Sequence, residues 1–187
     1  SNPYDAKGLM TAAIRDDNPV IYMFHKGVMG LPWMAKNRRS IGEVPQESYE
    51  VEIGKASVAR AGTDVTVVAL ALSVHHSLDV AETLEADGVS VEVIDLRSVV
   101  PLDRATIRES VAKTGRLVVV DEDYISFGLS GEVVASVVEA DPTMLKAAPI
   151  RVAVPDVPIP YARELEYAVL PTPARITAAV RDVLRRA

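Results

Sequence analysis

Apolar residues gather along the second two-thirds of this chain in short runs that predict strands. The run at 64–72 is almost uninterrupted, which indicates a strand buried on both faces, because neither side offers a polar stripe to water. Acidic residues stand where two of the runs end, at Asp95 and Asp121. The predicted strands cover residues 64–72, 89–96, 116–123 and 150–156.

Apolar residues at helical spacing fill the segments between these strands. One such stripe runs from Val74 to Leu84. Asp103 stands where the next helix would take its N-cap, and Thr172 followed by Pro173 is typical of a helix start. The predicted helices cover about 73–87, 103–113 and 129–140, with a final helix from residue 173.

Strands that alternate with helices indicate right-handed parallel crossovers and a sheet covered on both faces. A further short run at 56–62 is joined to the strand at 64–72 by Gly62 and Thr63 alone, and so short a link requires an antiparallel pair. We therefore expect an α/β fold over residues 51–187. Its three α/β/α layers would enclose a mixed, mostly parallel five-stranded sheet with one antiparallel strand.

The first 50 residues follow a different pattern. Residues 5–15 predict a helix, and the apolar run at 20–24 predicts a short buried strand. Residues 25–50 lose all periodicity and are rich in glycine and proline. Connections of this length are functional or join domains. We interpret 25–50 as a linker between a small N-terminal piece, 1–24, and the domain at 51–187.

Composition places the chain among globular proteins, with 49% apolar and 25% charged residues. The net charge of -6 disfavours a nucleic-acid surface, since phosphate binding needs a basic face. The absence of cysteine excludes disulfides, thiolate metal sites and a cysteine nucleophile, and it fits a reducing compartment. Neither a membrane span nor a signal peptide is visible, so we expect no membrane partner and a cytoplasmic location.

Polar side chains follow the predicted strands, and ligands bind beyond strand ends in sheets of this kind. His75 and His76 are adjacent, so on a helix they point about 100° apart and do not easily share a metal. The acids at 121–123 could hold magnesium, but we favour a role in which one carboxylate reaches an adjacent helix N-terminus. Asp95 and Arg97 either border a ligand or order a joint between subunits.

The segment GLSG at 128–131 does not complete a catalytic motif. A nucleophile elbow needs glycine two residues after the serine, and Glu132 stands there instead. A phosphate cradle needs more glycine or a lysine. A well-built fold without a complete catalytic set is typical of one part of a larger assembly.

Six segments in order resemble the beta subunits of thiamine diphosphate-dependent 2-oxo acid dehydrogenases. These subunits belong to the decarboxylating component of the pyruvate, branched-chain and acetoin dehydrogenase complexes. The most specific segments are VEVIDLRSVVPLD at 91–103 and KTGRLVVVDED at 113–123. The others are DAKGLMTAAIRDDNPVIY at 5–22, Val44-Pro45 with Tyr49, GKASVARAGTDVTVVA at 54–69, and PDVPIPYARELE at 155–166.

The resemblance implies three parts. Residues 1–24 would be the last helix and strand of a pyrimidine-binding domain, 25–50 the linker, and 51–187 a transketolase-type C-terminal domain. In the family, the glutamate that activates the cofactor and the beta-chain active-site histidine lie in the half that this sequence does not contain. In the family, the diphosphate of the cofactor and its magnesium sit on the alpha subunit. The resemblance therefore assigns no catalytic and no cofactor-binding residue here, and the isolated chain is expected to be inactive.

The resemblance also implies a structural potassium ion, held by backbone carbonyls at the end of the first helix. The matching positions are Ala13, Asp16 and Asn18. Carbonyl oxygens suit such a hard cation. Free carbonyls are also present at every helix C-terminus by default, so an ion-free end is the competing interpretation.

By the same resemblance, the segment DLRSVVPLD lies in the domain that joins two beta subunits and abuts the rest of a tetramer. Our hypothesis is that Asp95 and Arg97 fix the loop by an ion pair or backbone bonds, while Pro101 and Asp103 start the next helix. The implied partners are the alpha subunit, a second beta subunit and a lipoyl-bearing acyltransferase core. Two departures are His25, near the position of a family glutamate, and Lys146, where relatives use acids for docking to that core.

These features favour the C-terminal part of a dehydrogenase beta subunit that acts on acetoin or a small 2-oxo acid. The alternative is a free-standing α/β binding or interaction module without catalysis.

Overall fold

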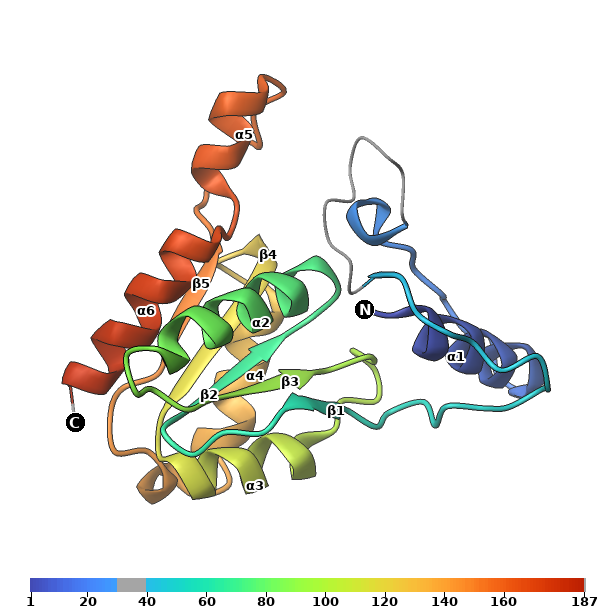
Figure 1. The fold of residues 1–187 in the computed structure, drawn as a ribbon, viewed down its shortest axis with the longest axis horizontal. Helices are drawn as coiled ribbons and strands as arrows, with labels where there is room; N and C mark the ends of the chain where they lie inside the picture. The colour runs from blue at the N-terminus through green and yellow to red at the C-terminus, as the bar shows by residue number, and fades with distance from the viewer. Residues whose placement is uncertain (30–39, 187) are drawn as a thin grey trace.

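A computed structural model describes residues 1–29 and 40–186 of the chain. Its centre is a five-stranded sheet with the order β1-β3-β2-β4-β5 (Figure 1). Strands β2 to β5 run parallel, and β1 lies antiparallel to β3 at one edge. The strands are β1 Ser57–Arg60, β2 Val65–Ala69, β3 Val91–Asp95, β4 Leu117–Tyr124 and β5 Ile150–Val154. This arrangement confirms the predicted fold class.

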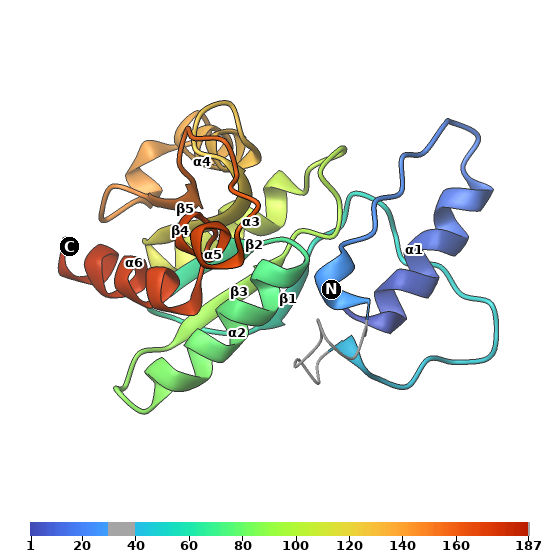
Figure 2. The same ribbon diagram turned by 90° about the horizontal axis from the view of Figure 1, so that it is seen from above.

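Two helices cover each face of the sheet, which gives three layers (Figures 1 and 2). Helices α2 (Leu72–Glu85) and α6 (Pro173–Arg185) enclose one apolar core, in which Leu84 and Ile176 are fully buried. Helices α3 (Arg104–Thr114) and α4 (Leu129–Val138) enclose the other core. The burial of β2 and β3 along their whole length explains their near-continuous apolar character.

The antiparallel strand has a different neighbour from the one that the short Gly62-Thr63 link indicated. Strand β1 pairs with β3 and not with β2. The link crosses the start of β3, where Thr63 and Asp64 both donate backbone hydrogen bonds to the Ser90 carbonyl. At Gly62 a Cβ atom would collide with the backbone of Val91 and Glu92, so only glycine permits this crossing.

Helix α1 (Pro3–Arg15) lies to one side of the sheet (Figure 1). Its N-cap is Asn2, and residues 45–51, at the end of the linker and the start of the domain, pack along it. Lys7 Nζ donates to the carbonyls of Gln46 and Glu47 at 3.1 and 2.8 Å, and the Tyr4 and Tyr49 rings stack with centroids 4.5 Å apart. These contacts attach the linker to α1.

The prediction of a buried strand at 20–24 was wrong for this structure. Residues 20–24 form no strand, and Ile21 and Phe24 are 88% and 61% exposed. Among residues 1–29 and 40–186, no strand pairs with this apolar run to supply ladder hydrogen bonds.

The remaining elements are short. They are the 3-10 turns η1 (Lys26–Val28) and η3 (Pro142–Met144) and the helix α5 (Arg163–Val169), which the sequence patterns did not predict. Within the described residues, none of the helices is long and apolar enough to span a membrane.

Candidate functional site: a polar joint between the N-terminal helix and the sheet

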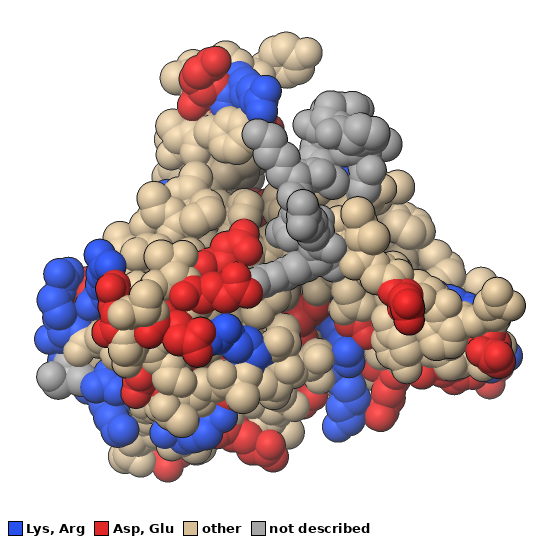
Figure 3. Space-filling view, viewed as in Figure 1, with Lys and Arg blue, Asp and Glu red and all other residues tan. Residues whose placement is uncertain are grey.

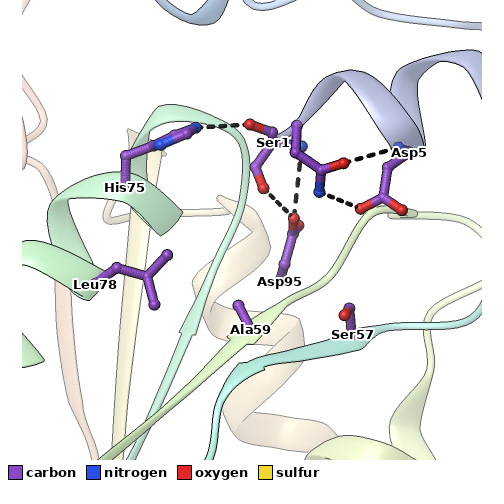
Figure 4. Close-up of a pocket in the computed structure, with 8 residues that line it drawn as sticks. Ser1, Asp5, Ser57, Ala59, His75, Leu78 and Asp95 are labelled. Carbon is purple, nitrogen blue, oxygen red and sulfur yellow. Dashed lines mark hydrogen bonds and ion pairs between the residues drawn. The ribbon is translucent and has the colours of Figure 1, made fainter. Parts of the chain in front are cut away.

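A cavity of about 210 Å³ lies between the first turn of α1 and the carboxyl end of β3 (Figure 4). Four parts of the chain that are distant in sequence meet there. Its lining residues are Ser1, Asn2, Asp5, Ser57, Ala59, His75, Leu78 and Asp95. The cavity therefore marks the contact between the N-terminal piece and the α/β domain.

Arg97 forms the main polar contact across this joint. Its Nε donates to Asp5 Oδ2 at 2.9 Å, and its Nη2 lies 2.7 Å from Asp5 Oδ1. Asp5 is only 1% exposed, so its carboxylate depends on this guanidinium and on Asn2, whose side chain donates to Oδ2 at 2.7 Å. A planar guanidinium that meets both carboxylate oxygens fixes orientation as well as distance.

Asp95 orders the turn that aims Arg97. The Arg97 backbone N–H donates to Asp95 Oδ1 at 3.1 Å, which is the backbone bond that the sequence hypothesis allowed. Arg97 adopts a positive φ of 57°, which is uncommon for a residue with a side chain. The ion pair of Arg97 is made with Asp5, and sequence reasoning missed this partner.

The opposite side of Asp95 faces the start of the described chain. Ser1 Oγ donates to Asp95 Oδ2 at 2.5 Å, and His75 Nε2 lies 2.7 Å from the Ser1 carbonyl oxygen (Figure 4). His75 is buried at the start of α2 and contacts the N-terminal piece, whereas His76 next to it is partly exposed. The two histidines therefore do not share a site.

Asp103 and Pro101 attach the same loop to the segment that leads into β1. Asp103 accepts from Thr106 N at 3.2 Å, which confirms the predicted cap of α3, and from Ala56 N at 3.0 Å. Burial raises the pKa of Asp103, but the hydrogen bonds from Thr106 and Ala56 outweigh it and hold the pKa below its ordinary value. Pro101 packs on Gly54, where a Cβ atom would lie 2.6 Å from the proline ring.

A second contact joins the start of the linker to the end of β4. His25 Nε2 lies 2.8 Å from Glu122 Oε2, and His25 Nδ1 accepts from the Gly27 N–H at 3.1 Å. The hydrogen bond with Glu122 raises the pKa of His25, against the opposing effect of burial. Neighbouring Asp121 accepts from Ser130 N at 2.8 Å, at the N-terminus of α4. The predicted helix-capping role of these acids is thus confirmed for Asp121.

The acids at 121–123, which could have held magnesium, make other contacts in the described part of the chain. Within residues 1–29 and 40–186, no three His, Asp or Glu side chains come together as metal ligands. Asp121 caps α4, Glu122 pairs with His25, and Asp123 accepts from the Tyr124 N–H at 2.7 Å. The acids after β4 are therefore engaged with the protein itself.

The proposed potassium positions lie where α1 ends. Asp16 is the C-cap of α1, and its Oδ1 accepts from Asn18 N and Nδ2 at 2.8 and 3.0 Å. These bonds lower the pKa of Asp16, the backbone bond more than the side-chain bond. The turn is exposed. Cation binding by Ala13, Asp16 and Asn18 stays a prediction.

The comparison with known proteins decides the family. Residues 54–176 match the transketolase, C-terminal domain. The chain belongs to that family. The match begins at Gly54, beside Pro101 in the joint, and ends inside α6.

The curated relatives are about twice as long as this chain. It is 40% identical over 185 residues to the acetoin:2,6-dichlorophenolindophenol oxidoreductase subunit beta of Cupriavidus necator, covering 99% of the chain and 52% of the relative. It is 43% identical over 184 residues to the pyruvate dehydrogenase E1 component subunit beta of Bacillus subtilis, covering 98% and 54%. The chain thus spans about half the length of these relatives.

One solved structure supports the same fold. It is described as a split gene transketolase, inactive beta4 tetramer. Its TM-score is 0.64 at 32% identity, over 80% of this chain and 47% of that one.

Proposed function

We propose that this chain is the C-terminal portion of the beta subunit of a thiamine diphosphate-dependent dehydrogenase. Its substrate would be acetoin or a small 2-oxo acid, and its location the cytoplasm. The observation that carries the proposal is the match to the beta subunits of two such enzymes over nearly the whole chain, at 40% and 43% identity. The role of this portion is assembly, and the cofactor is held elsewhere.

The joint supports an architectural role. Asp5, Asp95 and Arg97 are used to bind one part of the protein to another, so they are not available to a substrate. Arg97 orients α1, and α1 ends at the proposed potassium positions. In the full assembly, thiamine diphosphate would supply the carbanion chemistry. The residues described here would position the domain that borders it.

Exposed apolar side chains on the N-terminal piece support the assignment of residues 1–24 to a larger pyrimidine-binding domain. Ile14, Ile21 and Met23 are exposed and lie within a short stretch. Large exposed apolar side chains that are near one another in the chain favour an interaction surface there. We propose that it packs against the remainder of that domain.

The test is ligand binding by the purified 187-residue chain. Calorimetric titration with thiamine diphosphate and magnesium should give no saturable heat, and a thermal-shift screen with nucleotides should give no stabilisation. Specific saturable binding by the isolated chain would favour the free-standing α/β binding module instead.

Replacing Arg97 with alanine should weaken folding or assembly. If this variant kept its stability and its assembly but the assembled enzyme lost activity, the proposed structural role of Arg97 would be contradicted.

The wider assembly is part of the same proposal. An alpha subunit, a second beta subunit joined through the 95–103 loop, and a lipoyl-bearing acyltransferase core are the expected partners. Lys146 is engaged here in the protein's own packing, since its backbone N–H donates to the Gly115 carbonyl at 2.7 Å and its side chain covers Gly115.

A further inference from the structure

We propose that a projecting arm, residues 155–170 with Phe127, is the surface by which this chain docks on a different polypeptide, its alpha-type subunit. The chemistry that it requires is an apolar groove edged by basic groups. This inference rests on the proposed function, because that proposal supplies the alpha-type subunit.

The arm stands away from the domain. It leaves the carboxyl end of β5, carries α5, and returns to the start of α6, so α5 projects beyond the sheet (Figure 1). None of the residues of α5 is buried. Isolated helices shorter than about 12 residues are marginal in water, and α5 has seven residues. A helix of this length without a buried face needs packing that the described residues do not supply.

The base of the arm is nevertheless held firmly. Arg175 of α6 donates to the carbonyls of Val169 and Leu170 at 2.8 and 2.9 Å, and to Ala153 at 2.7 Å. The arm is therefore pre-organised at its base and open at its tip, which reduces the ordering cost of binding.

Phe127 is attached to the same base. Ser126 donates to Asp156 from Oγ at 2.7 Å and from its backbone N at 3.3 Å, so the loop with Phe127 lies against the start of the arm. Phe127 is fully exposed and has a positive φ of 63°, which is a genuine outlier for a bulky residue. Backbone strain that presents an aromatic ring to solvent is typical of a binding site.

The exposed side chains of the arm are of the types that are common at the centre of protein–protein interfaces. Aromatic residues carry most of the binding energy at protein contacts. On the face shown in Figure 3, the projecting part carries uncharged side chains along much of its length, with acidic and basic side chains near its tip. The exposed apolar residues are Phe127, Val157, Ile159, Tyr161, Leu165 and Tyr167.

The charged residues of the arm indicate whether its partner is a second copy of this chain or a different polypeptide. Residues 155–170 carry three acidic groups, at Asp156, Glu164 and Glu166, and one basic group, Arg163, which lies over the Tyr167 ring. Two copies that met through this surface would place the same acidic excess face to face. The surface therefore suits a different chain with basic groups around an apolar groove.

The test is site-specific photo-crosslinking in the protein co-expressed with its alpha-type subunit. The crosslinking amino acid p-benzoyl-phenylalanine is placed at Tyr161, and in the control at Glu109, an exposed residue of α3 on another part of the surface. We expect a crosslink to the alpha-type subunit from position 161 and none from position 109. A crosslink between two copies, or within the chain itself, would overturn the inference.

A second variant measures the energetic contribution. Tyr161→Ala combined with Leu165→Ala should weaken association with the alpha-type subunit at least tenfold and leave the melting temperature unchanged, because both side chains are exposed. Glu164→Lys should also weaken it, while Glu109→Lys should not. Suppose that an assembly forms, but that position 161 gives no crosslink and these variants do not weaken association. The arm is then excluded as the docking surface, and the proposed function stands. If no assembly with an alpha-type subunit forms at all, both fail.

Discussion

Arg97 Nη2 lies 2.7 Å from Asp5 Oδ1, although the two residues are 92 positions apart in the chain. This contact links the first turn of α1 to the loop after β3. It is the point at which an N-terminal piece without a core of its own is attached to a well-packed α/β domain. This pair therefore helps to fix how the two parts are oriented.

Arg97→Ala should lower the free energy of unfolding by about 3 kcal/mol, because it leaves the buried Asp5 carboxylate without its charge partner. Denaturant titration measures this change. The matched control is Arg104→Ala, which removes an exposed ion pair with Glu132 and should cost less than about 1 kcal/mol. Equal effects of the two substitutions would contradict the buried joint.

Asp103→Ala should destabilise the protein by about 1–2 kcal/mol, since it removes the N-cap of α3. The same carboxylate also accepts from Ala56 N, so the segment directly before β1 should loosen. Hydrogen exchange should show faster exchange of the Ala56 and Thr106 amides in the variant. Unchanged protection of both amides would argue against this dual role.

Glu92 is buried on β3 and accepts from Ser110, Lys113 and the Gly62 N–H. Burial raises its pKa, but these bonds outweigh it and hold the pKa below the ordinary value of 4.5. A depressed folded-state pKa contributes stability that is present above the unfolded pKa and lost as pH falls through the folded pKa. The stability difference between the protein and Glu92→Gln should therefore be largest above pH 4.5 and shrink in stronger acid.

The measurement is denaturant titration at a series of pH values. Glu109→Gln is the control, because Glu109 is an exposed acid on α3. A Glu92→Gln variant that matches the parent protein at neutral pH would show that the buried network contributes nothing.

The His25–Glu122 contact should give a pH dependence of the opposite sense. Because the folded-state pKa of His25 is raised above its ordinary value of 6.5, its contribution is fully present below that value and is lost as pH rises through the folded pKa. Melting curves should show that His25→Gln lowers the melting temperature more on the acid side of 6.5 than on the alkaline side. If the difference in melting temperature stayed the same at every pH, Glu122 would not stabilise the charged form of His25.

Local sequence patterns were sufficient for the α/β domain. The strands at β2 to β5 and the helices α2, α3, α4 and α6 follow from apolar runs and stripes, because each buries one face or both against a neighbour in the same chain. The capping roles of Asp103 and Asp121 could also be predicted, since a cap and its helix are close in sequence.

Long-range contacts could not be predicted in the same way. No local signal distinguishes Asp5 from any other first-turn acid, yet Arg97 is its partner from a distant loop. The neighbour of β1 depends on the close crossing at Gly62. Helix α5 lacks a buried stripe, so its pattern gave no indication of a helix. The run at 20–24 has the composition of a strand, but composition does not show whether a partner strand lies beside it.

The most direct test of the central claim is the mass of the assembly formed by this protein and its alpha-type subunit, determined by native mass spectrometry. The account predicts that the two chains associate into one complex, that thiamine diphosphate is retained only in that complex, and that the 187-residue chain alone retains none. A stable monomer of this chain that turns over a substrate without a second polypeptide would contradict it.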